Sequence, residues 1–158
     1  MGANLIKKIL LPLIAASALL NGADLDALQK ECDGGKGASC YELGVLYDNA
    51  REGAAQDYKK AAELYSKACK LGNGAGCSNL GFAYANGRGV KQDYAKASEF
   101  YAKACDMGNG GGCYNLGNLY AKRRGVKEDA NAAKKYLKKA CEMEPELACD
   151  RYKEFTQK

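Results

Sequence analysis

The chain has 158 residues, with 24 Lys and Arg against 19 Asp and Glu, eight cysteines and no histidine. The formal net charge is only +5 at pH 7, and the sequence has no dense basic stripe of the kind that binds nucleic acid. We therefore expect no nucleic-acid partner. Structural zinc sites use histidine or closely spaced cysteines. Neither is present in this sequence, so we expect no metal and no cofactor.

Residues 1–22 have the features of a cleaved secretory signal. Lys7 and Lys8 form a short basic region, and an apolar run follows over 9–20. Ala16-Ser17-Ala18 offers a cleavage site, and Asn21-Gly22-Ala23 offers a weaker one. The apolar run is shorter than the roughly 20 residues that span a bilayer. No cysteine lies at its end to carry a lipid. We therefore predict a secreted or periplasmic protein with no stable membrane anchor. A buried N-terminal helix is the alternative.

The eight cysteines form four C-x7-C pairs that recur every 36 or 37 residues. In an exported chain, an even set at regular spacing predicts a disulfide framework. Only local pairing gives every unit the same bond: Cys32 with Cys40, Cys69 with Cys77, Cys105 with Cys113 and Cys141 with Cys149. Each such short loop stabilises the fold by roughly 2 to 3 kcal/mol in the chain-entropy model.

The rest of the sequence repeats in step with the cysteines, which predicts an all-α solenoid of stacked helical hairpins over 24–158. We place a capping helix at 24–32, repeats at about 40–76, 77–112 and 113–148, and a second capping helix at 149–158. In each repeat, the first helix holds the second cysteine of a pair in its first turn. The second helix ends at the next pair's first cysteine.

The first helix of each repeat has an apolar face at 3, 4 and 7 spacing. Leu80, Gly81 and Tyr84 show the pattern, and the equivalent tyrosines are Tyr47 and Tyr120. A helical glycine costs about 1 kcal/mol relative to alanine, so we predict that it permits close approach of a neighbouring helix. The tyrosine ladder resembles a functional stripe, but its spacing favours a place in the core.

The second helix of each repeat has clear start and stop signals. Asp57, Asp93 and Asp129 are placed to cap its N-terminus or to lie in its first turn. Glycine and asparagine follow its last cysteine at 72–74 and 108–110, where a left-handed residue ends a helix.

A second stripe on the first helix of each repeat is our candidate binding surface. Positions two, five and nine after the cysteine share one side of the helix, separate from the packing face, and they vary between copies. They are Glu42, Val45 and Asn49; Asn79, Phe82 and Asn86; and Asn115, Asn118 and Lys122. Asparagine-rich grooves can hold an extended peptide backbone. The alternative is an ordinary hydrated surface.

The LG-x2-Y, G-V, D-x3-A and KAC segments, in that order, resemble the Sel1-like repeat, a relative of the tetratricopeptide repeat (TPR). With the C-x7-C staple and the leader, the chain is similar to the Helicobacter cysteine-rich protein family. The resemblance implies a TPR-like, disulfide-stapled right-handed superhelix that is secreted. It also implies penicillin binding with weak β-lactamase activity.

The residues supply no recognisable catalytic motif for that activity, so the catalytic residues are unknown and we leave open whether the chain is an enzyme. Penicillin-recognising serines stand in S-x-x-K, and none of the serines after the leader does. We expect the chain to bind a peptide, a protein or a peptidoglycan fragment on the concave face. β-Lactam binding and hydrolysis is the alternative that the resemblance implies.

Overall fold

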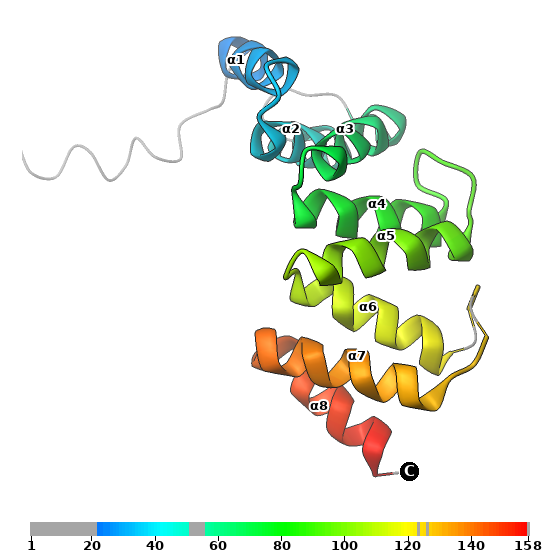
Figure 1. Ribbon diagram of the computed structural model, residues 1–158. Coiled ribbons are helices and arrows are strands. Elements are labelled where there is room, and N and C mark those ends of the chain that lie inside the picture. Colours follow the sequence, from blue (N-terminus) through cyan, green and yellow to red (C-terminus); the bar gives the residue numbers. More distant parts are fainter. Residues whose placement is uncertain (1–21, 51–55, 123, 126, 158) are drawn as a thin grey trace, which may run out of the picture.

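The computed structural model describes residues 22–50, 56–122, 124–125 and 127–157. Within these ranges eight helices stack in chain order into a column, with α1 at the top and α8 at the bottom (Figure 1). They are α1 (Gly22–Asp33), α2 (Gly37–Asn49), α3 (Tyr58–Lys70), α4 (Gly74–Asn86), α5 (Tyr94–Asp106), α6 (Gly110–Ala121), α7 (Ala130–Met143) and α8 (Pro145–Thr156). The predicted signal segment lies outside the described residues except for its last residue, so it stays a prediction.

Four disulfides close the hairpins α1–α2, α3–α4, α5–α6 and α7–α8. They are the predicted bonds: Cys32–Cys40, Cys69–Cys77, Cys105–Cys113 and Cys141–Cys149, with Cα atoms 4.4–4.6 Å apart. The cysteines of the first three bonds are at most 1% exposed. These sulfurs therefore fill the interior where the two helices of a hairpin meet, and the predicted all-α solenoid of stapled hairpins is confirmed.

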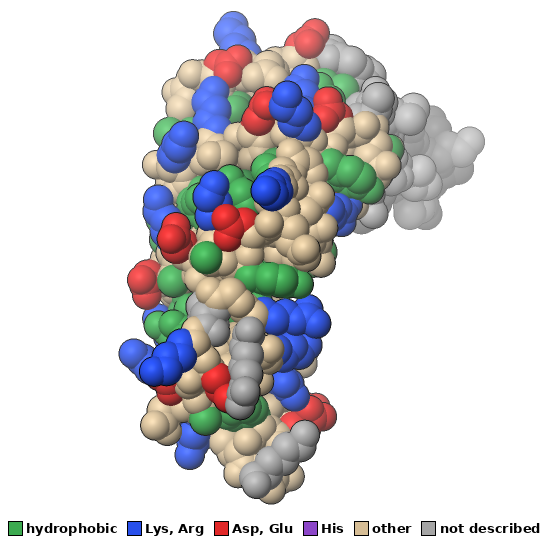
Figure 2. All heavy atoms as spheres, turned by 90° about the vertical axis from the view of Figure 1, so that its right-hand side faces the viewer, with side chains coloured by type: hydrophobic (Ala, Val, Ile, Leu, Met, Phe, Trp, Pro, Cys, Tyr) green, Lys and Arg blue, Asp and Glu red, His purple; other side chains and the backbone are tan. Residues whose placement is uncertain are grey.

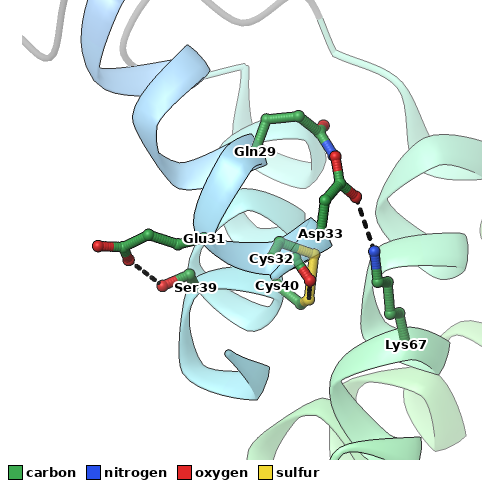
Figure 3. Close-up of a disulfide and its surroundings, with 7 residues drawn as sticks. All are labelled: Gln29, Glu31, Cys32, Asp33, Ser39, Cys40 and Lys67. Carbon is green, nitrogen blue, oxygen red and sulfur yellow. Dashed lines mark hydrogen bonds and ion pairs between the residues drawn. A yellow bond between two sulfur atoms is a disulfide. The ribbon is translucent and has the colours of Figure 1, made fainter. Parts of the chain in front are cut away.

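The first disulfide sits among polar contacts that fix α1 to its neighbours (Figure 3). The Ser39 hydroxyl in α2 donates a hydrogen bond to Glu31 in α1. The Lys67 ammonium in α3 donates to Asp33 Oδ1 at 2.7 Å. Helix α1 is thereby tied both to its own hairpin and to the next one, as a capping helix should be.

These contacts predict a pH effect at the N-terminal end of the column. The hydrogen bonds from Lys67 and Gln29 lower the pKa of Asp33 below that of a free aspartate. A lowered folded-state pKa stabilises the fold at pH values above the unfolded pKa, and this stabilisation is lost as the pH falls through the folded pKa. We expect Lys67→Gln to raise the pKa of Asp33 toward its ordinary value, measured by carboxyl-carbon NMR titration.

Glu31 is the internal control for this titration. Its pKa is lowered by Ser39 and Lys36, and Lys67 is not among the causes. The Glu31 titration curve should therefore be the same in Lys67→Gln and in the parent chain. An unchanged Asp33 curve in the variant would contradict the assigned contact.

Glycines at one recurring position let consecutive hairpins pack closely. A Cβ on Gly44 would lie 2.8 Å from the Tyr65 ring, and one on Gly81 would lie 2.7 Å from the Tyr101 ring. These glycines are in α2 and α4, and the tyrosines are in α3 and α5. The predicted close approach is confirmed, and it is made by the next helix in the chain.

The predicted helix caps are present. The structure also has a second set of helix caps, which was not predicted from the sequence. The side chains of Asp57, Asp93 and Asp129 each accept a backbone hydrogen bond at the start of α3, α5 and α7. Gly72 and Gly108 have φ values of 85° and 83°, as expected for left-handed residues after a helix. The asparagines that follow them are N-caps, because their Oδ1 atoms accept from Gly76 and Gly112 at 2.7 Å.

The tyrosine ladder packs between the helices but is only partly buried. Tyr84 stacks on Phe100 with ring centroids 5.6 Å apart, and Tyr120 stacks on Tyr136 at 5.8 Å. Tyr47 instead lies under the Lys60 ammonium, 4.0 Å from its centroid. The ladder therefore serves packing, but its tyrosines are partly exposed and do not lie in the fully buried core that their spacing favoured.

Candidate functional site

Two neighbouring clefts follow the helices α4 and α6. The first cleft has a volume of about 250 Å³, and its walls include Asp48, Tyr58, Tyr65, Asn79, Phe82 and Arg88. The second cleft has a volume of about 160 Å³, and its walls include Phe82, Asn86, Tyr94, Tyr101, Asn115, Asn118, Lys122 and Arg124. Phe82 is 44% exposed and belongs to both clefts. The clefts are thus successive compartments of one surface, which we call the groove.

The two clefts are built from equivalent positions of successive repeats. In each cleft, one tyrosine is the first residue of an odd-numbered helix, and a second tyrosine follows two turns later in that helix. An asparagine and an arginine complete each set. The equivalent pairs, 36 residues apart, are Tyr58 and Tyr94, Tyr65 and Tyr101, Asn79 and Asn115, and Arg88 and Arg124. In Figure 2 hydrophobic and basic side chains lie next to one another along the right-hand margin, midway down the column.

The Arg-Gly turns place the two arginines. Gly89 has a φ of 72°, and a Cβ there would lie 2.0 Å from the carbonyl oxygen of Tyr58. Only glycine lets the turn approach the start of α3 this closely. The approach brings the Arg88 guanidinium over the Tyr58 ring, 4.3 Å from its centroid. A contact at this distance is attractive, because the ring face is negative.

The second turn repeats the arrangement more loosely. A Cβ on Gly125 would lie 2.2 Å from the Tyr94 Cβ. The Arg124 guanidinium lies 5.7 Å from the Tyr94 centroid, and its Nη1 donates to the Tyr94 hydroxyl at 3.4 Å. Each cleft is therefore closed at one end by an arginine and a tyrosine.

The two clefts differ in charge. In the first, Asp48 Oδ1 lies 3.0 Å from Arg88 Nη2, so the acid and the base neutralise one another. The position equivalent to Asp48 in the second cleft is Ala85. The lining of the second cleft includes Lys122 and Arg124 and no acidic side chain among the described residues. The groove is therefore neutral at one compartment and positive at the next.

Each cleft has a buried phenol in its floor. Tyr65 and Tyr101 are each 3% exposed, and burial raises the pKa of both far above that of a free tyrosine. Both hydroxyls are therefore protonated at any physiological pH and act as hydrogen-bond donors. Tyr65 donates to Asp48 Oδ2 at 3.4 Å.

The structure brings six of the nine predicted stripe residues to the groove. They are Asn79, Phe82, Asn86, Asn115, Asn118 and Lys122. The three from α2 line neither cleft: Val45 packs against the buried cluster around Leu80, and Glu42 and Asn49 are exposed. The groove thus takes its stripe residues from the second and third repeats, while the first repeat contributes Asp48, Tyr58 and Tyr65 instead.

Three of the groove asparagines already have partners. Asn79 makes a side-chain hydrogen bond with Tyr65. Asn86 donates to the carbonyl of Phe82 in its own helix at 2.9 Å. Asn118 Oδ1 accepts from Arg151 Nε in α8 at 3.0 Å. Asn115 makes no hydrogen bond with a described side chain or backbone group, so both ends of its amide remain for a ligand. Binding of a peptide backbone by the stripe stays a prediction, and Asn115 is the stripe asparagine whose amide is open to it.

Sequence reasoning missed the far wall of the groove. Tyr58, Tyr94, Arg88 and Arg124 come from the odd-numbered helices and the turns. A signal was present, because Asp-Tyr recurs at 57–58 and 93–94 and Arg-Gly-Val recurs at 88–90 and 124–126. The same segments also fit a helix cap and a turn, and that simpler interpretation assigns them no role in binding.

The described residues contain no group of three or more His, Cys, Asp or Glu side chains that could hold a metal ion. All eight cysteines are in disulfides, so none is a thiolate nucleophile. In the part of the chain that the structure describes, no helix combines the length and apolar character that crossing a bilayer requires.

Comparison with known proteins identifies the repeat. The Sel1 repeat model matches at 37–73, 74–109 and 111–145, which begins each unit about three residues before our predicted boundaries. No curated protein sequence matches the chain.

Solved structures share the fold. Helicobacter pylori cysteine-rich protein B is similar with a TM-score of 0.64 and 32% identity, over 80% of this chain and 90% of that one. A Sel1 repeat protein from Oxalobacter formigenes gives 0.70 and 26%, over 76% of this chain and 49% of that one. The protein c5321, a protective antigen of uropathogenic Escherichia coli, gives 0.71 and 33%, over 75% of this chain and 25% of that one. The chain thus spans half or less of these last two proteins.

Three matched repeats cover more than half of the sequence, and the helices, caps and staples of the structure follow their period. The chain belongs to the Sel1 repeat family.

Proposed function

We propose that the protein is an exported binding module that holds an extended peptide, or the peptide of a cell-wall fragment, in the groove. The observation that supports this most directly is the pair of equivalent clefts joined at Phe82. Successive compartments one repeat apart suit an extended chain that places one side chain in each. Extended concave surfaces of this kind are what solenoid proteins use for binding.

The chemistry of the groove supports a peptide ligand. Phe82 offers an exposed aromatic surface between the clefts, and Asn115 offers an amide donor and acceptor. Aromatic anchors near the centre of a contact surface are typical of binding hot spots. Sel1 repeats generally mediate protein–protein interactions, which agrees with this choice.

The cysteines support export. Every cysteine is paired in a local disulfide, and such bonds persist in oxidising compartments. We propose that the protein is secreted or periplasmic after removal of residues 1–22. β-Lactam hydrolysis stays the alternative that the family resemblance implies.

The test begins with phage display of random peptides on the oxidised protein, followed by calorimetric titration of a selected peptide. We expect the double variant Phe82→Ala with Asn115→Ala to weaken binding about 30- to 100-fold. This is the effect of losing one hot spot and one buried hydrogen-bonding group, together about 2 to 3 kcal/mol. The matched control is Glu99→Ala with Lys134→Ala, two exposed residues of α5 and α7, which should bind as the parent does.

Normal affinity in the groove variant would contradict the proposed site. The same preparations should be mixed with a chromogenic cephalosporin. Turnover that survives rigorous purification and disappears in the groove variant would replace the binding role with the enzymatic one.

A further inference from the structure

The first cleft already contains a bound carboxylate, which the protein itself supplies. Asp48 lies between the Arg88 guanidinium, at 3.0 Å, and the hydroxyl of the buried Tyr65, at 3.4 Å. The first contact is an ion pair, and the second is a long hydrogen bond to the other carboxylate oxygen. The first cleft therefore shows how this scaffold holds a carboxylate.

The second cleft keeps the arginine and the phenol but lacks the acid. Arg124 and Tyr101 stand where Arg88 and Tyr65 stand one repeat earlier, whereas Ala85 replaces Asp48. Among the described residues, Arg124 contacts Tyr94 and makes no ion pair. A guanidinium whose equivalent is neutralised internally thus faces an open cleft.

The Tyr101 hydroxyl points to a ligand in the second cleft independently of Arg124. Its side chain is 3% exposed and lines the second cleft, and its hydroxyl makes no hydrogen bond with a described residue. The described residues contain no fully enclosed side-chain polar atom without a partner. This hydroxyl therefore opens to the cleft. Buried hydrogen-bond donors normally have an acceptor. A ligand could therefore supply the acceptor for the Tyr101 hydroxyl.

We propose that the second cleft binds a carboxylate of an acidic peptide, which Arg124 and Tyr101 hold as Arg88 and Tyr65 hold Asp48. The carboxylate is that of an Asp or Glu side chain or of a peptide C-terminus, because both present the same group. Lys122 adds a second positive charge to the same lining. This inference rests on the proposed peptide binding and assigns the chemistry of one compartment.

The test uses the full oxidised chain and three hexapeptide arrays with otherwise randomised positions. The first array has Glu at the third position with acetylated and amidated ends, and the second has Gln there with the same ends. The third has the same Gln and a free C-terminus. We expect half-saturation of the Glu array or the free-carboxylate array at an about tenfold lower protein concentration than of the amidated Gln array. The array that is preferred identifies the source of the carboxylate.

Two variants remove the preference in different ways. Arg124→Gln removes the guanidinium, and Ala85→Asp places an internal carboxylate where Asp48 stands in the first cleft. Both should reduce the preference to less than twofold, read in each variant as the ratio of the half-saturation concentrations of the amidated Gln array and the preferred carboxylate array. Lys134→Gln makes the same change of charge at an exposed position of α7 and should keep the full preference.

A parent protein that binds all three arrays equally would overturn the carboxylate site and leave the proposed peptide binding standing. Persistence of the preference in both variants would overturn it as well. Binding to none of the arrays would overturn both the peptide binding and the inference that rests on it.

Discussion

Reduction of the four disulfides is expected to lower the free energy of unfolding by about 10 kcal/mol, because each short staple contributes about 2 to 3 kcal/mol in the chain-entropy model. The whole stability of a small domain is about 5 to 15 kcal/mol. The sulfurs lie in small buried clusters with alanine, leucine and aromatic side chains. The reduced protein should therefore lose most of its helical circular dichroism in urea concentrations that leave the oxidised protein intact.

The measurement is a pair of urea titrations, with and without a non-thiol reductant, read at 222 nm. Single-pair variants serve as controls. Replacing Cys105 and Cys113 by alanine should lower the free energy of unfolding by about 2 to 3 kcal/mol. A reduced protein with an unchanged urea midpoint would show that packing alone holds the column together.

Gly89→Ala is expected to destabilise the protein by about 3 kcal/mol, because the turn that contains Gly89 touches the backbone of another helix. The new Cβ would lie 2.0 Å from the carbonyl oxygen of Tyr58, a backbone atom that cannot rotate away. Overpacking costs about 1 to 3 kcal/mol. A left-handed alanine costs about 1 to 2 kcal/mol more. Because the turn would have to withdraw, Arg88 should also leave the Tyr58 ring.

Gly108→Ala separates the cost of the left-handed backbone from the cost of the steric contact. Gly108 has a similar φ of 83°, but nothing lies within 4 Å of a Cβ built there. This variant carries only the backbone cost and should lose about 1 to 2 kcal/mol. Equal losses in the two variants, measured by urea titration, would contradict the close contact between the turn and α3.

The local features of the fold could be predicted because they depend on residues close in sequence. Cysteines eight positions apart meet across one short reversal, so the period of the sequence specified all four bonds. The aspartate caps act within a single turn of their own helix. The asparagine caps at Asn73 and Asn109 depend on equally local contacts. They were not predicted, because asparagine between two glycines is also typical of a helix end.

Only one side of the groove could be predicted, because residues of two successive repeats line each cleft. Helical periodicity places Asn79, Phe82 and Asn115 on one side of their helices. Their partners Tyr58 and Arg88 are 30 residues apart and meet only through the stacking of hairpins. No periodic pattern within one helix contains that contact.

Hairpin stacking also explains where the groove ends. In the third repeat, Ala130 and Leu137 replace the two tyrosines of each cleft, and Arg151 of the capping helix α8 binds Asn118. The set of side chains that lines the two clefts is therefore not repeated a third time. The last stripe residues, Asn118 and Lys122, contribute to the second cleft alone.

Chemical-shift mapping tests the central claim most directly. A display-selected peptide is added to isotope-labelled oxidised protein, and the backbone and side-chain NH resonances are followed. We predict that the largest shifts fall on Phe82, Asn115 and Arg124, which face the groove. Shifts confined to exposed residues that line neither cleft, such as Glu99 and Lys134, would contradict the account.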